Sequence, residues 1–271
     1  MEQRIKRIAI ALGLFLGCFL LRAQSIALPE GCECLQLIDG QNTLPDVNYL
    51  YRDISNGTGV ILLHNLAFIL GDNDLDAAVL MPWDRPITDA RWYDGDCFFA
   101  CDSTIYHCDS LGIAQEIIMA ESPITSFDVY DKGIVFSIDS FIGFYSFLSF
   151  KVEPLFHAEA SVLDVECLGE NVLFSSGKEV FAIGAGEIHP LLAADSSIIS
   201  FAPHYSGSLF IGTENEVFYI NPERQKVTLF KTGARDITLI DDDLFVIFQD
   251  NSSIKITNVS NYGILLAQSG R

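Results

Sequence analysis

The chain has 271 residues, of which 49% are hydrophobic, 11% aromatic and 19% charged. This composition excludes a disordered chain and supplies enough apolar material for one large core. The formal charge of −20 repels phosphate backbones and anionic lipid surfaces, so it argues against nucleic acid as a partner and favours cationic partners or divalent ions.

The first 23 residues have the pattern of a signal peptide. Three basic residues (Arg4, Lys6 and Arg7) precede an apolar run over residues 8–21, and we expect cleavage before Gln24. The run is shorter than the roughly 20 residues that a spanning helix needs, so no stable membrane span is expected after cleavage; an uncleaved anchor is the alternative. The sequence therefore predicts an exported protein, located in the periplasm, at the cell surface or outside the cell.

Residues 24–49 lie between this leader and a repeat that fills the rest of the chain. They contain prolines, glycines and one short apolar run over residues 35–38. Two roles are open for this segment. It adds an edge strand to the last repeat unit and closes a ring, or it forms a cap held by Cys32 or Cys34.

Residues 50–271 contain an internal repeat of about 37 residues. Its anchor positions are separated by 37, 37, 38, 37 and 37 residues: Phe68, Ile105, Ile142, Val180, Val217 and Ile254. Three further columns keep the same phase. Six residues before the anchors stand Leu62, Phe99, Phe136, Phe174, Ile211 and Phe248. Eighteen before stand Leu50, Ile87, Ile124, Val162, Ile199 and Asp236, and twelve after stand Leu80, Ile117, Pro154, Leu192, Leu229 and Leu266.

Each unit is predicted to form four short strands. In the second unit the strands are expected at residues 87–92, 97–101, 104–108 and 115–119, separated by turn-forming pairs such as Asp94-Gly95 and Asp102-Ser103. Six four-stranded units of this length are similar to the β-propeller class, over residues 50–267. The resemblance implies an all-β, six-bladed propeller of antiparallel blades, with a pair of packed sheets or a β-solenoid as the alternative architecture.

Six cysteines remain after leader cleavage, and in an exported chain they permit up to three disulfides with fifteen connectivities. Cys97 and Cys108 face each other if the Asp102-Ser103 turn has two residues, whereas a three-residue loop puts them out of register. Their spacing does not resemble a zinc site.

Placing the sequence on the propeller plan gathers two sets of loops on one face, where recognition residues are expected. The candidate binding residues there are Trp83, Arg85, Asp139, Phe141 and Arg235. Trp83 and Arg85 lie in a stretch bounded by two prolines and are residue types enriched at interface hot spots. The alternative is structural: Trp83 packs between blades while Arg85 pairs with Asp84 or Asp89.

Two groups of carboxylates are candidate sites for Ca²⁺ or another divalent ion. Asp72, Asp74 and Asp76 alternate along the chain but lack the glycine and distal glutamate of a complete calcium loop. Strand positions that line the propeller channel carry carboxylates that can converge on a cation: Asp53, Asp89, Asp128 and Asp164. The alternative is that strand alternation turns some of them away.

No nucleophile elbow, P-loop or dinucleotide fingerprint occurs in the sequence. We therefore expect a non-enzymatic binding or assembly module that uses the loop face to recognise a protein or a small ligand. A metal-dependent hydrolase or lyase with its site at the channel mouth is the alternative, and a calcium-stabilised structural domain is a third interpretation.

Overall fold

A computed structural model of the chain describes residues 87–259 except 95, 110–112, 185, 241 and 251, and five further strands within residues 34–82 for which only the backbone is described. Every regular element in these parts of the chain is a β-strand. None of the described residues form a helix long and apolar enough to cross a membrane. The predicted leader at residues 1–23 lies outside the described residues.

Five blades are each built from four consecutive antiparallel strands, paired in chain order. The first two are β2 (Val47–Asp53), β3 (Thr58–Leu63), β4 (Leu66–Leu70) and β5 (Val79–Pro82), then β6 (Asp89–Tyr93), β7 (Asp96–Cys101), β8 (Thr104–Cys108) and β9 (Ala114–Met119). The next two are β10 (Ser126–Tyr130), β11 (Gly133–Ile138), β12 (Phe141–Ser146) and β13 (Val152–His157), then β14 (Val162–Leu168), β15 (Asn171–Ser176), β16 (Glu179–Gly184) and β17 (Glu187–Ala193). The fifth is β18 (Ile198–Pro203), β19 (Leu209–Thr213), β20 (Val217–Ile220) and β21 (Lys226–Phe230).

The remaining sheet combines both ends of the described chain. It contains β22 (Ala234–Ile240), β23 (Asp243–Phe248), β24 (Ser253–Ile256) and β1 (Cys34–Ile38), in the order β1-β24-β23-β22. The sequence predicted six complete units within residues 50–271, and this prediction needs correction. The outer edge of β24 pairs with β1, with Cys34 opposite Ile256, whereas the repeat assigned that edge to a strand near Leu266.

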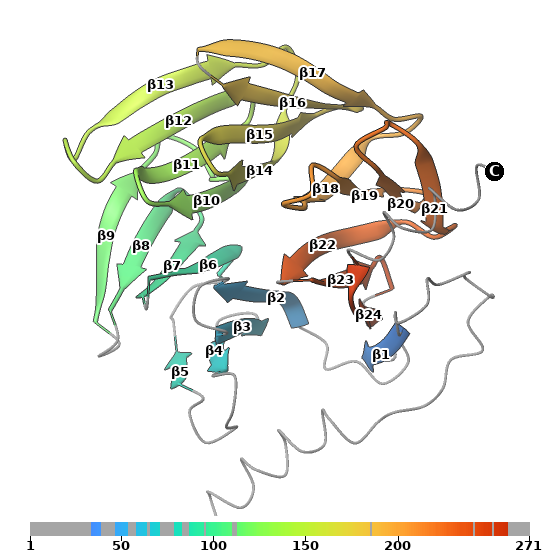
Figure 1. Cartoon of the computed structure of the whole chain (residues 1–271). Helices are drawn as coiled ribbons and strands as arrows, with labels where there is room; N and C mark the ends of the chain where they lie inside the picture. The colour runs from blue at the N-terminus through green and yellow to red at the C-terminus, as the bar shows by residue number, and fades with distance from the viewer. Residues whose placement is uncertain are drawn as a thin grey trace, which may run out of the picture.

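The blades stand around a common centre (Figure 1). The innermost strands are the first strand of each consecutive blade and β22 of the remaining sheet: β6 contacts β2 and β10, β10 contacts β14, β14 contacts β18, β18 contacts β22, and β22 contacts β2. The last strand of each consecutive blade is outermost (Figure 1). Most residues of β13 and β17 are exposed. The predicted all-β propeller with four-stranded antiparallel blades is therefore confirmed.

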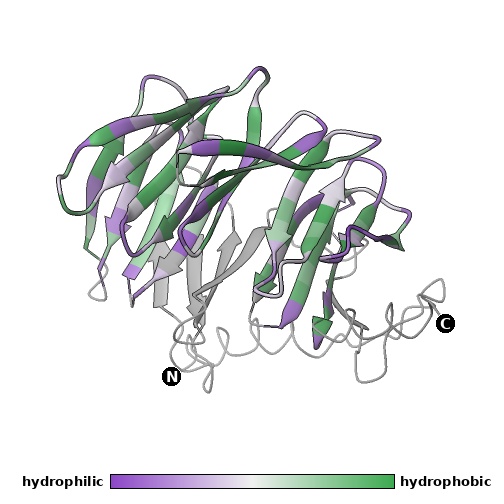
Figure 2. Cartoon of the chain, turned by 45° about the horizontal axis from the view of Figure 1, so that its top comes forward, coloured by the Kyte–Doolittle hydropathy of each residue, from purple (hydrophilic) through white to green (hydrophobic). Residues whose placement is uncertain are grey.

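The core lies between neighbouring blades. Phe98 and Ile105 of one blade pack in the same cluster as Phe127 and Ile134 of the next. The anchor column and the column six residues before it supply many of these contacts, since their members between residues 99 and 248 are buried. Figure 2 shows hydrophobic residues concentrated along the strands and hydrophilic ones at many turns. This pattern follows from the radial arrangement, because both faces of each middle strand are covered by protein.

Tight hairpins set the register of the middle strands. Cys101 pairs with Thr104, so Asp102 and Ser103 form a two-residue turn, and Asp102 has a φ of 56°. The equivalent turn after β11 starts at Asp139, with a φ of 50°. Two-residue hairpins require residues that tolerate positive φ, and Asp is among the non-glycine residues that do.

A candidate ligand pocket in the central channel

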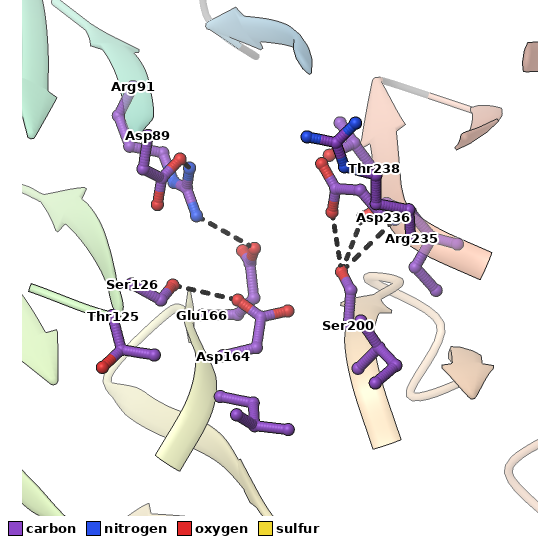
Figure 3. A pocket seen from close by; sticks show the side chains of 13 residues that line it. Asp89, Arg91, Thr125, Ser126, Asp164, Glu166, Ser200, Arg235, Asp236 and Thr238 are labelled. Carbon is purple, nitrogen blue, oxygen red and sulfur yellow. Dashed lines mark hydrogen bonds and ion pairs between the residues drawn. The ribbon is translucent and has the colours of Figure 1, made fainter. Parts of the chain in front are cut away.

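A cavity of about 210 Å³ lies among five of the innermost strands, near the ends at which those strands begin. Its walls come from β6, β14, β18 and β22 and from the start of β10 (Figure 3). The charged side chains that line it are Asp89, Arg91, Asp164, Glu166, Arg235 and Asp236. The cavity therefore holds four carboxyl groups and two guanidinium groups.

Two of the aspartates also link adjacent blades. The Phe127 amide donates to Asp89 Oδ2 at 3.4 Å, and the Phe201 amide donates to Asp164 Oδ2 at 3.0 Å. In each case the carboxylate belongs to one innermost strand and the amide to the next one around the centre. Each aspartate thus satisfies a backbone donor that would otherwise face the channel.

Serines make the same kind of link in the alternate blades. Ser126 Oγ donates to Asp164 Oδ1 at 3.0 Å and accepts the Val165 amide at 3.3 Å. Ser200 Oγ donates to Asp236 Oδ1 at 2.9 Å and accepts the Ile237 amide at 3.3 Å. A polar layer therefore runs around the cavity, with aspartate and serine alternating from blade to blade (Figure 3).

β-bulges help to place these side chains. The register between the first and second strands of a blade shifts between Val162 and Asp164, and again between Ile198 and Ser200. A third shift lies just before Asp236, after Ala234. A bulge adds a residue to one strand and re-aims the side chains that follow it. In β14, β18 and β22 the residue directly after the shift, Asp164, Ser200 or Asp236, lines the cavity.

Arg91, two residues after Asp89 on β6, lies at the centre of a second charged group. Its guanidinium contacts Asp89 Oδ1 at 2.5 Å, Asp128 Oδ1 at 3.3 Å and Glu166 Oε1 at 3.5 Å. Only 5% of the Arg91 side chain is exposed, so the three ion pairs are screened little by solvent. Asp128 also accepts the Cys167 amide at 2.7 Å, which links this group to the next blade.

The carboxyl groups hold their protons more strongly than isolated ones. Burial raises the pKa of Asp164 to about 6, against the hydrogen bond from Phe201. Burial and the charge of Asp164 raise the pKa of Asp236 to about 7. Burial, followed by repulsion from Asp128, raises the pKa of Glu166 well above its ordinary value. The pKa values of Asp89 and Asp128 also rise through burial, although Arg91 opposes the change. The charge of the cavity therefore changes near neutral pH.

Two of the predicted channel carboxylates, Asp89 and Asp164, line the cavity together with one predicted loop-face residue, Arg235. A third, Asp128, pairs with Arg91. Asp139 instead ties its own turn to the loop before β14, since it accepts a hydrogen bond from Ser161 at 2.5 Å. Phe141 packs edge-on against Phe136 and His157.

Several predicted site residues lie outside the described residues or in strands whose side chains are not described: Asp53, Asp72, Asp74, Asp76, Trp83 and Arg85. In the part of the chain that the structure describes, no group of three or more His, Cys, Asp or Glu side chains is arranged to hold a metal ion.

Sequence reasoning missed Glu166 and Asp236 as site residues. Asp236 carried a signal, because it is the single polar member of the column eighteen residues before the anchors. Glu166 carried none, since its place opposite Arg91 depends on how two separate blades pack.

Comparisons with known proteins identify the fold and go no further. No protein-family model matches the chain, and no curated protein sequence matches it. A streptogramin B lyase structure is similar with a TM-score of 0.59 and 12% identity, covering 83% of this chain and 97% of that one. The computationally designed Ika8 protein is similar with a TM-score of 0.56 and 14% identity, covering 77% of this chain and 70% of that one. At these identities the likeness supports the propeller fold alone.

Proposed function

We propose that the chain is an exported, non-enzymatic binding module that takes a small cationic ligand in its central cavity. The observation that carries this proposal is a 210 Å³ cavity lined by four carboxyl groups and two guanidinium groups. The volume fits a short aliphatic amine or guanidine better than a drug-sized molecule, whose pockets start at about 300 Å³.

The electrostatics of the cavity support a cation. Asp164 and Asp236 have pKa values of about 6 and 7, so both charges are costly when they form without a partner. A bound ammonium group would favour the ionised forms and would be attracted more strongly than in bulk water. The strongly negative net charge of the chain also favours the approach of cations.

We also propose that the sheet of β22, β23, β24 and β1 is a sixth blade that closes the ring, with a repeat of about 37 residues. Contacts between the innermost strands run continuously from β2 through β22 and back to β2, which supports closure. Hydrogen bonds between adjacent blades link residues 36 to 39 apart in sequence, close to the proposed period.

The leader, a calcium site and the loop face complete the proposal. Residues 1–23 would direct export and be removed, and Ca²⁺ at Asp72, Asp74 and Asp76 would serve stability. A protein partner at the loop face would contact Trp83 and Arg85, with Asp139, Phe141 and Arg235 on the same face. The test of that surface is capture of partners by the wild-type chain and by a variant with both Trp83→Ala and Arg85→Ala.

Isothermal titration calorimetry of the mature chain tests the cavity. The probes are putrescine and agmatine, with succinate as the anionic control. We expect saturable binding of at least one cation and none of succinate. Losing one carboxylate contact through Asp236→Asn should weaken binding about tenfold, equivalent to about 1.4 kcal/mol. Asp195→Asn changes the same net charge at a fully exposed side chain and should leave affinity unchanged. Absence of saturable binding by either cation would refute the proposal.

A second candidate function is a hydrolase or lyase with its site in the same cavity, in the metal-dependent form predicted from the sequence. The observation that favours it is the pair Asp164 and Asp236, whose pKa values near neutral pH suit general acid–base catalysis. The fold similarity to a streptogramin B lyase is compatible with this reading. Mass spectrometry of a bound cation after incubation separates the two functions, since a binding module returns its ligand unchanged. Elemental analysis of the dialysed protein tests the metal requirement.

A further inference from the structure

Two cysteines face each other across the middle of the second blade. In the pairing of β7 with β8, Cys97 lies directly opposite Cys108. The two-residue turn at Asp102 and Ser103 fixes this register, because Cys101 is already paired with Thr104 at the turn. Cys97 and Cys108 therefore lie on the same face of the hairpin.

The separation of directly opposite residues suits a disulfide. Their Cα atoms are about 4.5–5.5 Å apart in antiparallel sheets, inside the range of about 4.4–6.8 Å found in disulfides. Their Cβ atoms, about 4.5–5.5 Å apart, need a small contraction to reach the disulfide range of about 3.5–4.5 Å. Such a contraction is local and leaves the register of the hairpin intact.

Both residues are free thiols in the structure, in surroundings that also suit a disulfide. Both residues are nearly inaccessible, with 0% of Cys97 and 1% of Cys108 exposed. Their Sγ atoms make long hydrogen bonds to the Phe98 and Asp109 carbonyls, at 3.9 and 3.7 Å. Thiols are weak donors, so little hydrogen-bond energy is lost when their protons leave.

The other cysteines in described strands lack an opposite cysteine in the strand pairing. Cys101 is opposite Thr104, Cys167 is opposite Val172 in another blade, and Cys34 is opposite Ile256. Among the cysteines in described strands, Cys97 and Cys108 are therefore the pair that the register places directly opposite each other.

We propose that Cys97 and Cys108 form a cross-strand disulfide in the native protein. The two thiols lose two protons and two electrons as the S–S bond forms. An external disulfide, such as oxidised glutathione, accepts the electrons, and its own S–S bond is cleaved to two thiols. This inference goes beyond ligand binding and does not depend on it.

The bond should form before the blades pack. Burial raises the pKa of Cys108 to about 11 and raises that of Cys97 further still. The thiolate is the species that attacks a disulfide. Because few folded molecules carry a thiolate at Cys97 or Cys108, these two residues oxidise slowly once the protein has folded. Folding in the presence of an oxidant avoids this barrier, since the unfolded chain exposes both thiols.

Peptide mapping without reduction tests the proposal on the full chain. The chain is unfolded and reduced, refolded in a mixture of oxidised and reduced glutathione, and alkylated under denaturing conditions. It is then digested with chymotrypsin, which cleaves after aromatic residues such as Phe98, Phe99 and Tyr106. These cuts place Cys97, Cys101 and Cys108 in three separate peptides. We expect the Cys97 and Cys108 peptides joined, two hydrogen masses below their sum, with neither residue alkylated.

Two variants sharpen the result. Cys101→Ala alters a neighbouring buried cysteine on the same strand and should leave the joined peptide in place. Cys97→Ser should abolish it and leave Cys108 open to alkylation. Alkylation of both residues in the wild-type chain, or the joining of either one to a different cysteine, would overturn the proposal. The wild-type result decides the matter even if a variant fails to fold.

Discussion

Replacing Asp236 with asparagine should make the protein more stable at pH 8 than the wild type. In the unfolded chain this carboxyl ionises near its ordinary pKa of 3.8, and in the folded protein near 7. Between these values the unfolded state binds fewer protons, so the free energy of unfolding falls as pH rises from about 4 to 7. Above pH 7 the wild type carries the full loss of stability that comes from ionising Asp236 in the folded protein. The asparagine variant does not have this loss, because its side chain cannot ionise.

The size of the gain follows from the pKa change. A rise from 3.8 to about 7 corresponds to about 4 kcal/mol at 1.36 kcal/mol per unit. Asp236 is only partly buried, so solvent reduces this figure, and we expect a gain of about 2 kcal/mol at pH 8. The amide oxygen of asparagine can still accept the Ser200 hydroxyl, which keeps the link between blades.

Urea unfolding followed by circular dichroism, at pH 4 and at pH 8, measures the effect. The wild type and Asp236→Asn should have similar free energies of unfolding at pH 4, where the native carboxyl is protonated. Asp195→Asn, at a fully exposed carboxyl, controls for the change in net charge. A variant that is less stable than wild type at pH 8, or that gains equally at both pH values, would refute the electrostatic reasoning.

Three further predictions concern the same cavity. Arg91→Met should destabilise the protein by about 3–5 kcal/mol in urea unfolding, because it leaves three carboxyl groups without their shared cation; a loss below about 1 kcal/mol would contradict the geometry. Ser126→Ala should cost about 1–2 kcal/mol, since Asp164 and the Val165 amide both lose a partner, whereas an unchanged midpoint would speak against the link. Putrescine affinity should increase from pH 5 to pH 8 as Asp164 and Asp236 ionise, and a flat calorimetric profile would argue against their role.

The strands of the second blade were predictable because their signals are local. The expected strand at residues 104–108 matches β8 at both ends, and the other three in that blade agree within two residues. The Asp102-Ser103 turn could also be predicted, since alternation and turn chemistry depend on neighbouring residues alone.

The site was only partly predictable because it depends on packing between blades. The sequence identifies Asp89, Asp128 and Asp164 as residues of innermost strands but does not reveal that Arg91 joins them to Glu166. The bulge before Asp236 shifts the alternation of side chains along β22, and the sequence did not predict Asp236 as a cavity residue. The pairing of β1 with β24 was one of two open roles, since a strand partner far away in sequence leaves no local pattern.

The sheet shared by β1 and β24 joins two distant parts of the chain. Cys34 and Ile256 are opposite each other although 222 residues separate them in sequence. Synthesis proceeds from the N-terminus, so β1 emerges long before its partner β24. The loop-closure penalty grows only with the logarithm of length, which costs little at equilibrium, but such distant pairings slow folding. We therefore expect the two ends to join late in folding, and resistance to proteases to be acquired at that stage.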